Sequence, residues 1–295
     1  MGCGYWGRNI LRDLVALGCE VEVAEPGGAY PIAGARRVVG QLADLATSLD
    51  GYVVATPSPT HAGVIRALAD RGRPIFCEKP LTTDGVSARD LAAQLGGRLF
   101  VMHKWVYHGG VQTLAALARS GELGPVQGVF TRRLQWGKPA AAADAIWELA
   151  IHDLTIIRAI LGELPPVAVA RAVMHGDQME GLTATLGRAP FAHLEVGAHW
   201  PGPERKIRVM FRDGLAMLDD PLADHIGVVR GAAPAGERRD PQKLEQRPID
   251  TEWPLIKELR AFVEHLSGGP PPPTDAWAGA EIVTALESLR LAAAP

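Results

Sequence analysis

The sequence predicts an α/β protein of two domains, with a parallel sheet in the N-terminal domain and an antiparallel sheet in the C-terminal domain. Up to residue 102, short β-rich runs alternate with helical patterns, and from about residue 103 long helix candidates precede successive strand-like segments. The 295 residues, 47% of them hydrophobic, are enough to bury two ordinary cores. We therefore expect domains at residues 1–102 and 103–295.

The N-terminal domain alternates strands with helices. Apolar residues recur at helical spacing over residues 10–17 and 64–69. The β-rich runs that flank and follow these helices are residues 21–24, 51–55, 74–77 and 99–102. This alternation is typical of βαβ units, which build a parallel sheet.

The C-terminal domain begins with helix candidates at residues 111–120 and 144–161 and ends with helices at 255–266 and 277–291. Strand-like runs lie between them, joined by turns such as Asp213-Gly214, and this spacing favours an antiparallel sheet. The runs are residues 167–170, 192–196 and 206–211. Residues 232–248 have the composition of an exposed loop, and residues 268–273 that of a stiff linker.

The composition argues against several classes of partner. A net charge of -3 without a long basic run gives no footprint for nucleic acid or an anionic membrane surface. No apolar stretch reaches the roughly 18 residues that span a bilayer, and the N-terminus lacks signal-peptide features, so we expect a cytoplasmic protein. The cysteines at positions 3, 19 and 77 lack metal-ligand spacing, so we expect reduced thiols and no metal.

A glycine-rich loop opens the first helix. Gly2, Gly4 and Gly7 match the dinucleotide pattern, in which glycines permit a tight turn and let a pyrophosphate approach the helix N-terminus; Tyr5 and Trp6 lie within the same loop. We therefore expect a Rossmann dinucleotide-binding domain. The alternative is that these are ordinary turn glycines.

Glu25 follows the 21–24 run, 18 residues past Gly7. A carboxylate there accepts hydrogen bonds from both ribose hydroxyls and repels a 2'-phosphate, so the sequence favours NAD over NADP. The alternative is a solvated residue at the end of a strand.

The expected central strand is missing. The dinucleotide pattern normally follows a buried first strand, yet only Met1 precedes Gly2. Its loss would leave both neighbouring strands with unpaired backbone groups, each costing roughly 1–3 kcal/mol. Either the start lies further upstream, or another segment fills the gap.

Two loops after strands carry further candidate residues. Thr56, Pro57 and His61 follow the 51–55 run; prolines suit a rigid loop near a ligand, and Thr60 is expected to cap the next helix. The alternative is a plain strand-to-helix turn. A single histidine in a loop is weak evidence for a binding or catalytic role.

Glu78, Lys79 and Pro80 end the run at residues 74–77. Ligands in open α/β sheets bind outside the carboxyl ends of the strands, so Lys79 is expected beside the nicotinamide. Its ammonium group would polarise a carbonyl or stabilise an alkoxide during hydride transfer. The alternative is a surface ion pair between Glu78 and Lys79. A cis peptide before Pro80 is conceivable.

Glu148 and His152 are four residues apart and share one face of the predicted 144–161 helix. The carboxylate would orient the imidazole, which then acts as a general base near neutral pH. Read alone, the pair fits better a core or capped histidine beside a solvated glutamate. Asp153 points elsewhere and suits a hinge or a domain contact.

Taken together, these residues resemble the glucose-fructose oxidoreductase / inositol dehydrogenase / rhizopine catabolism (Gfo/Idh/MocA) family over nearly the whole chain. The motifs that carry the resemblance are the glycine loop, residues 55–57 with 60–62, residues 77–81, residues 120–124, His152, Glu258 with Leu259 and Phe262, and Gly279 with the final helix.

The resemblance implies a Rossmann domain followed by an α/β domain with an open, mostly antiparallel sheet that forms a homodimer or homotetramer. It implies oxidation of a secondary hydroxyl of a sugar, inositol or nucleotide-sugar, or the reverse reduction. Lys79 would lie beside the nicotinamide, and His152 would be the acid/base. Glu148 stands where the family usually has aspartate. Residues 147–153 look closest to relatives that act at C3 of nucleotide-sugars.

Lys104, Trp105 and Tyr107 lie where relatives often contact substrate, although a core or surface role is equally compatible with each. Two other functions remain open. One is a catalytically silent NAD-binding sensor or scaffold, and the other is an NAD-dependent, glycoside-cleaving activity.

Overall fold

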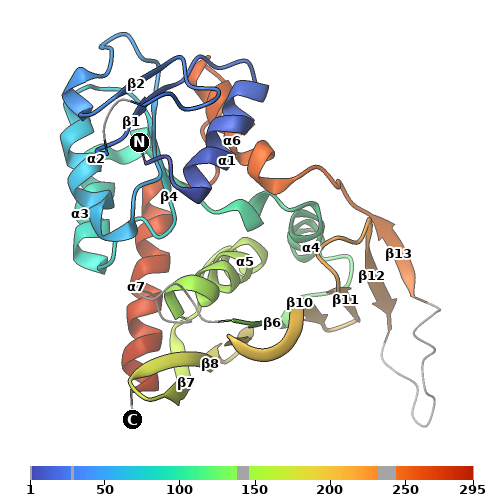
Figure 1. Cartoon of the computed structure of the whole chain (residues 1–295). Helices are drawn as coiled ribbons and strands as arrows, with labels where there is room; N and C mark the ends of the chain where they lie inside the picture. The colour runs from blue at the N-terminus through green and yellow to red at the C-terminus, as the bar shows by residue number, and fades with distance from the viewer. Residues whose placement is uncertain (1, 28–29, 138–145, 232–243, 295) are drawn as a thin grey trace. The chain divides into compact units, whose positions relative to one another are not determined.

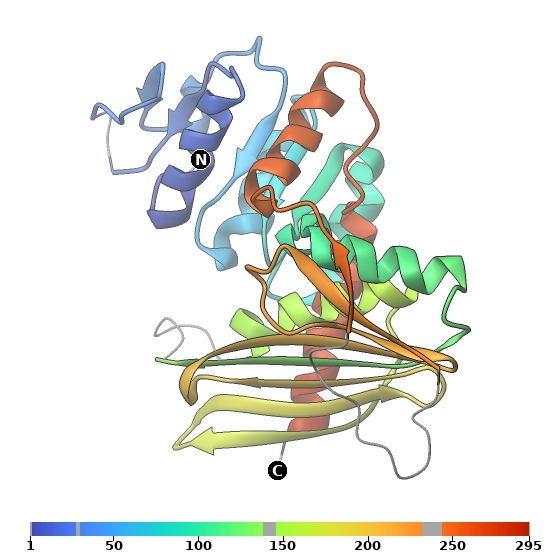
Figure 2. The same ribbon diagram turned by 90° about the vertical axis from the view of Figure 1, so that its right-hand side faces the viewer.

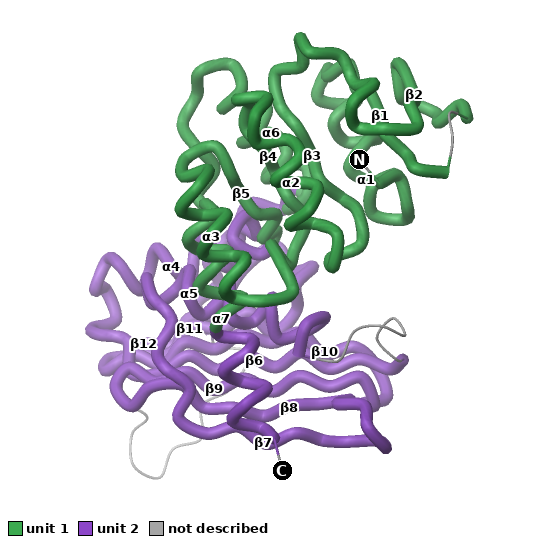
Figure 3. The backbone as a smooth tube through the Cα atoms, turned by 90° about the vertical axis from the view of Figure 1, so that its left-hand side faces the viewer, with its two compact units in different colours: residues 1–104, 253–284 green, residues 105–252, 285–295 purple. Residues whose placement is uncertain are grey.

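The computed structural model describes residues 2–27, 30–137, 146–231 and 244–294, and it divides into two compact units (Figures 1 and 3). Unit 1 comprises Met1–Lys104 and Trp253–Thr284, and unit 2 comprises Trp105–Glu252 and Ala285–Pro295. The expected division near residue 102 thus lies close to the change of unit. Residues 253–284, which the sequence assigned to the second domain, lie with the first.

Unit 1 alternates strands and helices as expected. Its strands are β1 (Glu22–Ala24), β2 (Arg37–Val39), β3 (Tyr52–Val54), β4 (Ile75–Glu78) and β5 (Leu99–Met102). Its helices are α1 (Tyr5–Ala16), α2 (His61–Ala69), α3 (Gly85–Leu95), α6 (Pro254–Leu266) and the first part of α7 (Ala276–Ala293). All strand pairs are parallel, and Figure 1 shows α2 and α3 on one side of the strands with α1 and α6 on the other.

The core of unit 1 explains why α6 belongs to it. Phe262 of α6 is 1% exposed, and its ring stacks on Phe76 of β4 with centroids 5.0 Å apart. Ile10 and Leu14 of α1 complete the same buried cluster. Burial of this much apolar surface favours docking of α6 onto the parallel strands, although more than 150 residues separate them in sequence.

The sheet of unit 1 is divided where the first strand was expected. Among the described residues, β1 pairs only with β2, and β3 pairs only with β4 in the order β3-β4-β5. A cavity of about 660 Å³ lies between the two pieces. The short strand ahead of the glycine loop is therefore absent from the described part of the chain, as its sequence indicated.

Unit 2 is one eight-stranded sheet in the order β13-β12-β11-β10-β6-β9-β8-β7, with α4 (Gly109–Ser120) and α5 (Ile151–Leu161) on one face (Figure 2). All neighbours are antiparallel except β6 and β9, so the expectation of a mostly antiparallel sheet is confirmed. The strands are β6 (Val126–Trp136), β7 (Val167–His175), β8 (Gln178–Gly187), β9 (Phe191–Gly197), β10 (His199–Phe211), β11 (Gly214–Leu218), β12 (His225–Arg230) and β13 (Glu245–Pro248).

Three local predictions need correction. Residues 245–248, expected in a loop, form the polar edge strand β13, while residues 232–243 lie outside the described residues. The helix expected from residue 144 has its first two residues outside the described part and begins as a π-helix at Ile146–Ala150. Thr60 does not cap α2 with its side chain, because its hydroxyl lies 2.8 Å from Thr56 Oγ1 and 2.7 Å from the Pro57 carbonyl instead.

Within the described ranges, no helix combines the length and apolar character needed to cross a bilayer.

Candidate active site

The glycine loop has the geometry that a phosphate-binding turn requires. Gly2 has φ +77°, and a Cβ there would lie 2.5 Å from the Ala55 carbonyl oxygen. A Cβ at Gly7 would lie 2.0 Å from the Gly2 carbonyl oxygen. Both positions therefore exclude any other residue. A Cβ at Gly4, in contrast, would meet none of the described atoms within 4 Å.

The loop leads directly into α1, a helix of 12 residues with Gly4 as its N-cap. Among the described residues, no side chain accepts a hydrogen bond from the first N–H groups of this helix. These donors and the positive end of the helix dipole favour an anionic group, and the space at Gly4 lets that group approach the backbone. The residues present thus fit the pyrophosphate of a dinucleotide.

Glu25 directly follows β1 and contacts the loop. Its Oε2 atom accepts a hydrogen bond of 2.6 Å from the backbone N–H of Cys3. This bond holds the carboxylate beside the glycine turn. The role of Glu25 as the residue that binds the ribose stays a prediction.

His61 ties together the two loops that follow β3 and β4. Its side chain is 1% exposed, with Nδ1 2.8 Å from the Pro80 carbonyl oxygen and Nε2 2.8 Å from the Thr56 carbonyl oxygen. Burial lowers the pKa of the imidazole. The ring therefore positions Thr56 and Pro80, and both of its nitrogen atoms contact backbone carbonyl groups of unit 1.

Glu78, Lys79 and Pro80 lie at the carboxyl end of β4. Glu78 Oε2 accepts a hydrogen bond of 2.9 Å from the backbone N–H of Lys79, and the Lys79–Pro80 peptide is cis. Burial raises the pKa of Glu78, while Lys79 and Lys104 act in the opposite direction. The carboxylate thus fixes the backbone from which the Lys79 side chain extends.

Glu258 lies close to Glu78, and the sequence predicted no function for it. It lies on α6, is 1% exposed, and its Oε2 atom has no hydrogen-bond partner among the described residues. Burial, together with the nearby Glu78, raises its pKa well above the usual value. In the sequence, its spacing from Leu255, Leu259 and Phe262 places Glu258 on the apolar face of a helix. This spacing is the signal from which its burial could have been predicted.

Lys104 and Trp6 meet within unit 1. The Lys104 ammonium nitrogen lies 4.7 Å from the centroid of the Trp6 ring, which is 42% exposed, and the neighbouring Tyr5 is 82% exposed. A cation over an indole face is attracted to it. Lys104 therefore supplies a positive charge beside the glycine-loop aromatics.

Trp105 and Tyr107 are buried inside unit 2, at 8% and 5% exposed. The Trp105 ring lies between the Arg133 guanidinium, 4.5 Å from its centroid, and the His108 ring, 5.1 Å away. This arrangement favours the core role that the sequence had left open for Trp105.

His152 lies in the first turn of α5, and Glu148 lies in the π-helical turn before it. No hydrogen bond joins these two side chains in the described part of the chain. The π-helical turn has a wider hydrogen-bond ring than an α-helix, so α-helical spacing alone does not place Glu148 and His152 on one face.

Asp153, next to His152, joins α5 to strand β6 through an ion pair with Arg133. Its Oδ2 atom lies 2.7 Å from Arg133 Nε, and both side chains are almost fully buried. Burial raises the pKa of Asp153, while Arg133 opposes that shift. This ion pair fixes the start of α5 and hence the backbone of His152.

The candidate residues fall into two sets. Unit 1 brings together the candidates for cofactor binding with the predicted catalytic lysine: Gly2, Gly4, Tyr5, Trp6, Gly7, Glu25, Thr56, Pro57, His61, Glu78, Lys79 and Lys104. Unit 2 holds Trp105, Tyr107, Glu148 and His152.

Comparison with known proteins gives a consistent picture. Residues 30–103 match the family GFO_IDH_MocA, described as an oxidoreductase family with an NAD-binding Rossmann fold. The match begins after the glycine loop and Glu25.

Two relatives and one solved structure illustrate the range of similar proteins. The chain is 26% identical over 311 residues to an inositol 2-dehydrogenase of Burkholderia vietnamiensis, covering 95% of this chain and 88% of that protein. It is 24% identical over 249 residues to a 2,7-anhydro-N-acetylneuraminate hydratase of Escherichia coli, covering 74% and 66%. A UDP-N-acetylglucosamine 3-dehydrogenase from Acidithiobacillus ferrooxidans shares the fold, with a TM-score of 0.82, 23% identity and coverage of 99% and 95%.

Proposed function

We propose, since this chain belongs to the Gfo/Idh/MocA family of NAD-binding Rossmann-fold oxidoreductases, that it transfers hydride between NAD and a secondary alcohol or ketone of a sugar, an inositol or a nucleotide-sugar. The observation that carries the proposal is the glycine loop, in which Gly2 and Gly7 close a turn that no side chain fits while Gly4 stays open.

In this proposal, the backbone of residues 2–7 and the start of α1 bind the pyrophosphate, and Glu25 binds the adenosine ribose. Glu25 is already held against the loop by the Cys3 N–H. A negative charge there disfavours the 2'-phosphate of NADP. Thr56 and Pro57 line the same edge of the strands, with His61 as the residue that positions them.

The nicotinamide, when bound, accepts or donates the hydride. The Lys79 ammonium then stabilises the charge that develops on the substrate oxygen. Glu78 restrains the Lys79 backbone through its 2.9 Å hydrogen bond. His152 takes up or returns the hydroxyl proton, and Asp153, through its ion pair with Arg133, fixes the turn that carries it.

Three further roles belong to this proposal. Glu148 would orient His152 through a hydrogen bond to the imidazole. Lys104 is a candidate contact for substrate hydroxyls or phosphates because it already lies beside the loop aromatics. Trp105 and Tyr107, both buried in unit 2, would support the site as core residues without contacting the substrate.

The test is turnover with NAD and a panel containing myo-inositol, simple sugars and UDP-N-acetylglucosamine. His152→Ala and Lys79→Ala should each lower kcat by a factor on the order of 100 or more, with NADH affinity nearly unchanged. His175→Ala is a matched control, because this exposed histidine is the last residue of β7 and has no role in the proposed site. Unaltered turnover in either active-site variant would refute the assignment.

A second candidate function has a specific observation in its favour, the similarity to a hydratase. In that case the same site would cleave or hydrate a sugar with no net change in the nicotinamide. Product formation without a change in nicotinamide absorbance would identify it. A silent NAD-binding protein would bind NADH and convert nothing, and the presence of both Lys79 and His152 argues against that alternative.

A further inference from the structure

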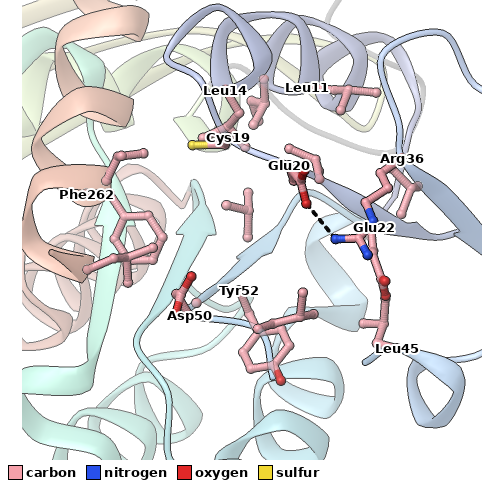
Figure 4. A pocket seen from close by; sticks show the side chains of 18 of the residues that line it. Leu11, Leu14, Cys19, Glu20, Glu22, Arg36, Leu45, Asp50, Tyr52 and Phe262 are labelled. Carbon is pink, nitrogen blue, oxygen red and sulfur yellow. Dashed lines mark hydrogen bonds and ion pairs between the residues drawn. The ribbon is translucent and has the colours of Figure 1, made fainter. Parts of the chain in front are cut away.

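Charged side chains of this protein commonly lie beside an opposite charge. In the cavity of unit 1, Glu20 and Arg36 form an ion pair of 2.5 Å (Figure 4). In unit 2, the buried Arg133 contacts Asp153 at 2.7 Å. Arg205 departs from this pattern, because its guanidinium group makes no hydrogen bond or ion pair with any described residue.

Arg205 lies on the face of the sheet that α5 covers. It stands directly opposite Arg133 in the pairing of β10 with β6, so the two side chains leave the sheet on the same side. Arg133 contacts Asp153 of α5, which identifies that side as the helix-covered one (Figure 2). Two like charges directly opposite each other destabilise a sheet unless another group compensates them.

The carboxylate next to Arg205 in sequence does not compensate its charge. Glu204 precedes it on β10, so its side chain lies on the opposite face of the sheet, where it contacts Arg132 at 3.1 Å and Lys206 at 3.4 Å. The carboxylate whose charge acts on Arg205 is that of Asp153, which already pairs with another arginine. One carboxylate thus faces two guanidinium groups.

The charge of Arg205 persists in this setting. Burial lowers the pKa of its guanidinium group, and Arg133 adds to this effect, whereas Asp153 opposes it. A guanidinium group nevertheless stays protonated at neutral pH. Because a partly buried charge without a full partner is unfavourable, an anion that reaches Arg205 would be bound favourably.

Both guanidinium groups keep N–H donors for such an anion. Arg133 uses Nε for Asp153 and packs over the Trp105 ring at 4.5 Å, and no other hydrogen bond of Arg133 is found in the described part of the chain. Arg205 is only half-buried. These side chains line one small recess of unit 2, which is too narrow for a sugar ring, so a ligand would meet Arg205 at the mouth of the recess.

We propose that Arg205 binds an anionic group of the substrate, a phosphate or a carboxylate, and thereby selects charged sugars over neutral ones. A planar guanidinium group presents paired N–H donors that match the oxygen pairs of both anions. Asp153 shares the recess with Arg205 and also fixes the turn that carries His152, so the anion would be held beside that turn. The inference rests on the proposed function and narrows its substrates to those with a phosphate or a carboxylate.

The first experiment measures binding by calorimetry without cofactor. The ligands are glucose, glucuronate and glucose 1-phosphate, and the proteins are the unaltered chain, Arg205→Gln and Arg208→Gln. Arg208 is the matched control, because it lies on the same strand but on the opposite face and pairs with Asp219 at 3.3 Å.

The unaltered chain and Arg208→Gln should bind at least one of the two anions about 10- to 100-fold more tightly than glucose, and Arg205→Gln should lose that preference. Loss confined to glucose 1-phosphate would assign a phosphate, and loss confined to glucuronate a carboxylate. A preference that survives in Arg205→Gln, or an unaltered chain that binds neither anion better than glucose, would overturn the proposal.

Thermal unfolding separates this binding role from a purely structural one. Arg205→Gln removes one of two facing positive charges, so its Tm should stay within about 2 °C of that of the unaltered chain. Arg205→Lys keeps the charge but not the paired donors and should retain only part of the anion preference. A large fall in Tm together with weaker binding of glucose and both anions alike would show a structural role and overturn the proposal.

Kinetics then distinguish this inference from the proposed function. With any substrate that is turned over, Arg205→Gln should raise KM for anionic substrates by about 10- to 100-fold while kcat changes little. Anion binding that depends on Arg205 in a chain that transfers no hydride would count against the proposed function alone. Turnover of anionic substrates with a KM untouched by Arg205→Gln would overturn this inference alone.

Discussion

Gly4→Ala separates the structural role of the glycine loop from its binding role. Gly4 has φ −66° and ψ −164°, a conformation that alanine adopts, and its new Cβ would meet none of the described atoms within 4 Å. The substitution should therefore leave the fold intact. Because alanine restricts the unfolded chain, stability should change by about 0.4–1 kcal/mol in the favourable direction.

The same methyl group occupies the space that a phosphate needs to reach the start of α1. A hydrogen bond from a backbone N–H to a charged oxygen contributes about 1.5–3 kcal/mol. Loss of one such bond lowers NADH affinity by about 10- to 100-fold. Gly7→Ala should behave differently, because its Cβ would collide with the Gly2 carbonyl oxygen at 2.0 Å and lower the Tm as well.

The assay pairs a fluorescence titration with NADH and a thermal unfolding curve on the same samples. Gly63→Ala is the control, since Gly63 lies on α2 with no described atom within 4 Å of its Cβ position and outside the proposed site. A Gly4→Ala protein that binds NADH as tightly as the unaltered chain would refute this account of the loop.

Three further predictions concern stability. Burial holds the folded-state pKa of Glu258 well above its usual value of 4.5, so the folded state binds more protons at this group than the unfolded state does. The contribution of this group to the free energy of unfolding is therefore lost as the pH rises from 4.5 through the folded-state pKa. Glu258→Gln should therefore flatten the decline of stability with rising pH in urea titrations, and a decline equal to that of the unaltered protein would contradict this. Phe262→Ala removes a ring stacked on Phe76 and should cost about 3–5 kcal/mol, measured by urea unfolding; a loss below 1 kcal/mol would mean that α6 is not part of this core. Asp153→Asn leaves Arg133 buried without its counter-charge and should cost about 3–5 kcal/mol, with near-normal stability as the contradicting result.

Four of the five strands of unit 1 were predictable because each is a short apolar run between turn residues, whereas β2 (Arg37–Val39) was not among the predicted runs. The 75–78 and 99–102 strands are almost fully buried, and buried parallel strands have continuous apolar sequences. The glycine pattern and Glu25 followed from spacing alone.

Strand β6 escaped prediction because Arg132 and Arg133 interrupt its apolar pattern. Arg133 is nevertheless buried, since Asp153 supplies its counter-charge from an element 20 residues away. The burial of Arg133 depends on a residue that is distant in the sequence, so no local pattern of apolar residues predicts it. The same limit applies to α6, whose apolar face is visible in sequence but whose docking partner is not.

The relation between Glu148 and His152 was predicted from α-helical spacing. The π-helical turn at Ile146–Ala150 departs from that spacing. The spacing of α6 places Glu258 on its apolar face, and tertiary packing then buries it almost fully. Sequence thus located most of the candidate residues, and packing determined how their side chains are used.

The central claim is that the glycine loop and Glu25 form an NAD site, and a titration with NADH and NADPH tests it most directly when run on the unaltered chain and on Glu25→Gln. The account predicts tighter binding of NADH than of NADPH, and a smaller preference in Glu25→Gln, which keeps an acceptor for the Cys3 N–H but loses the charge. Equal binding of the two cofactors by the unaltered chain, or a preference untouched by Glu25→Gln, would contradict it.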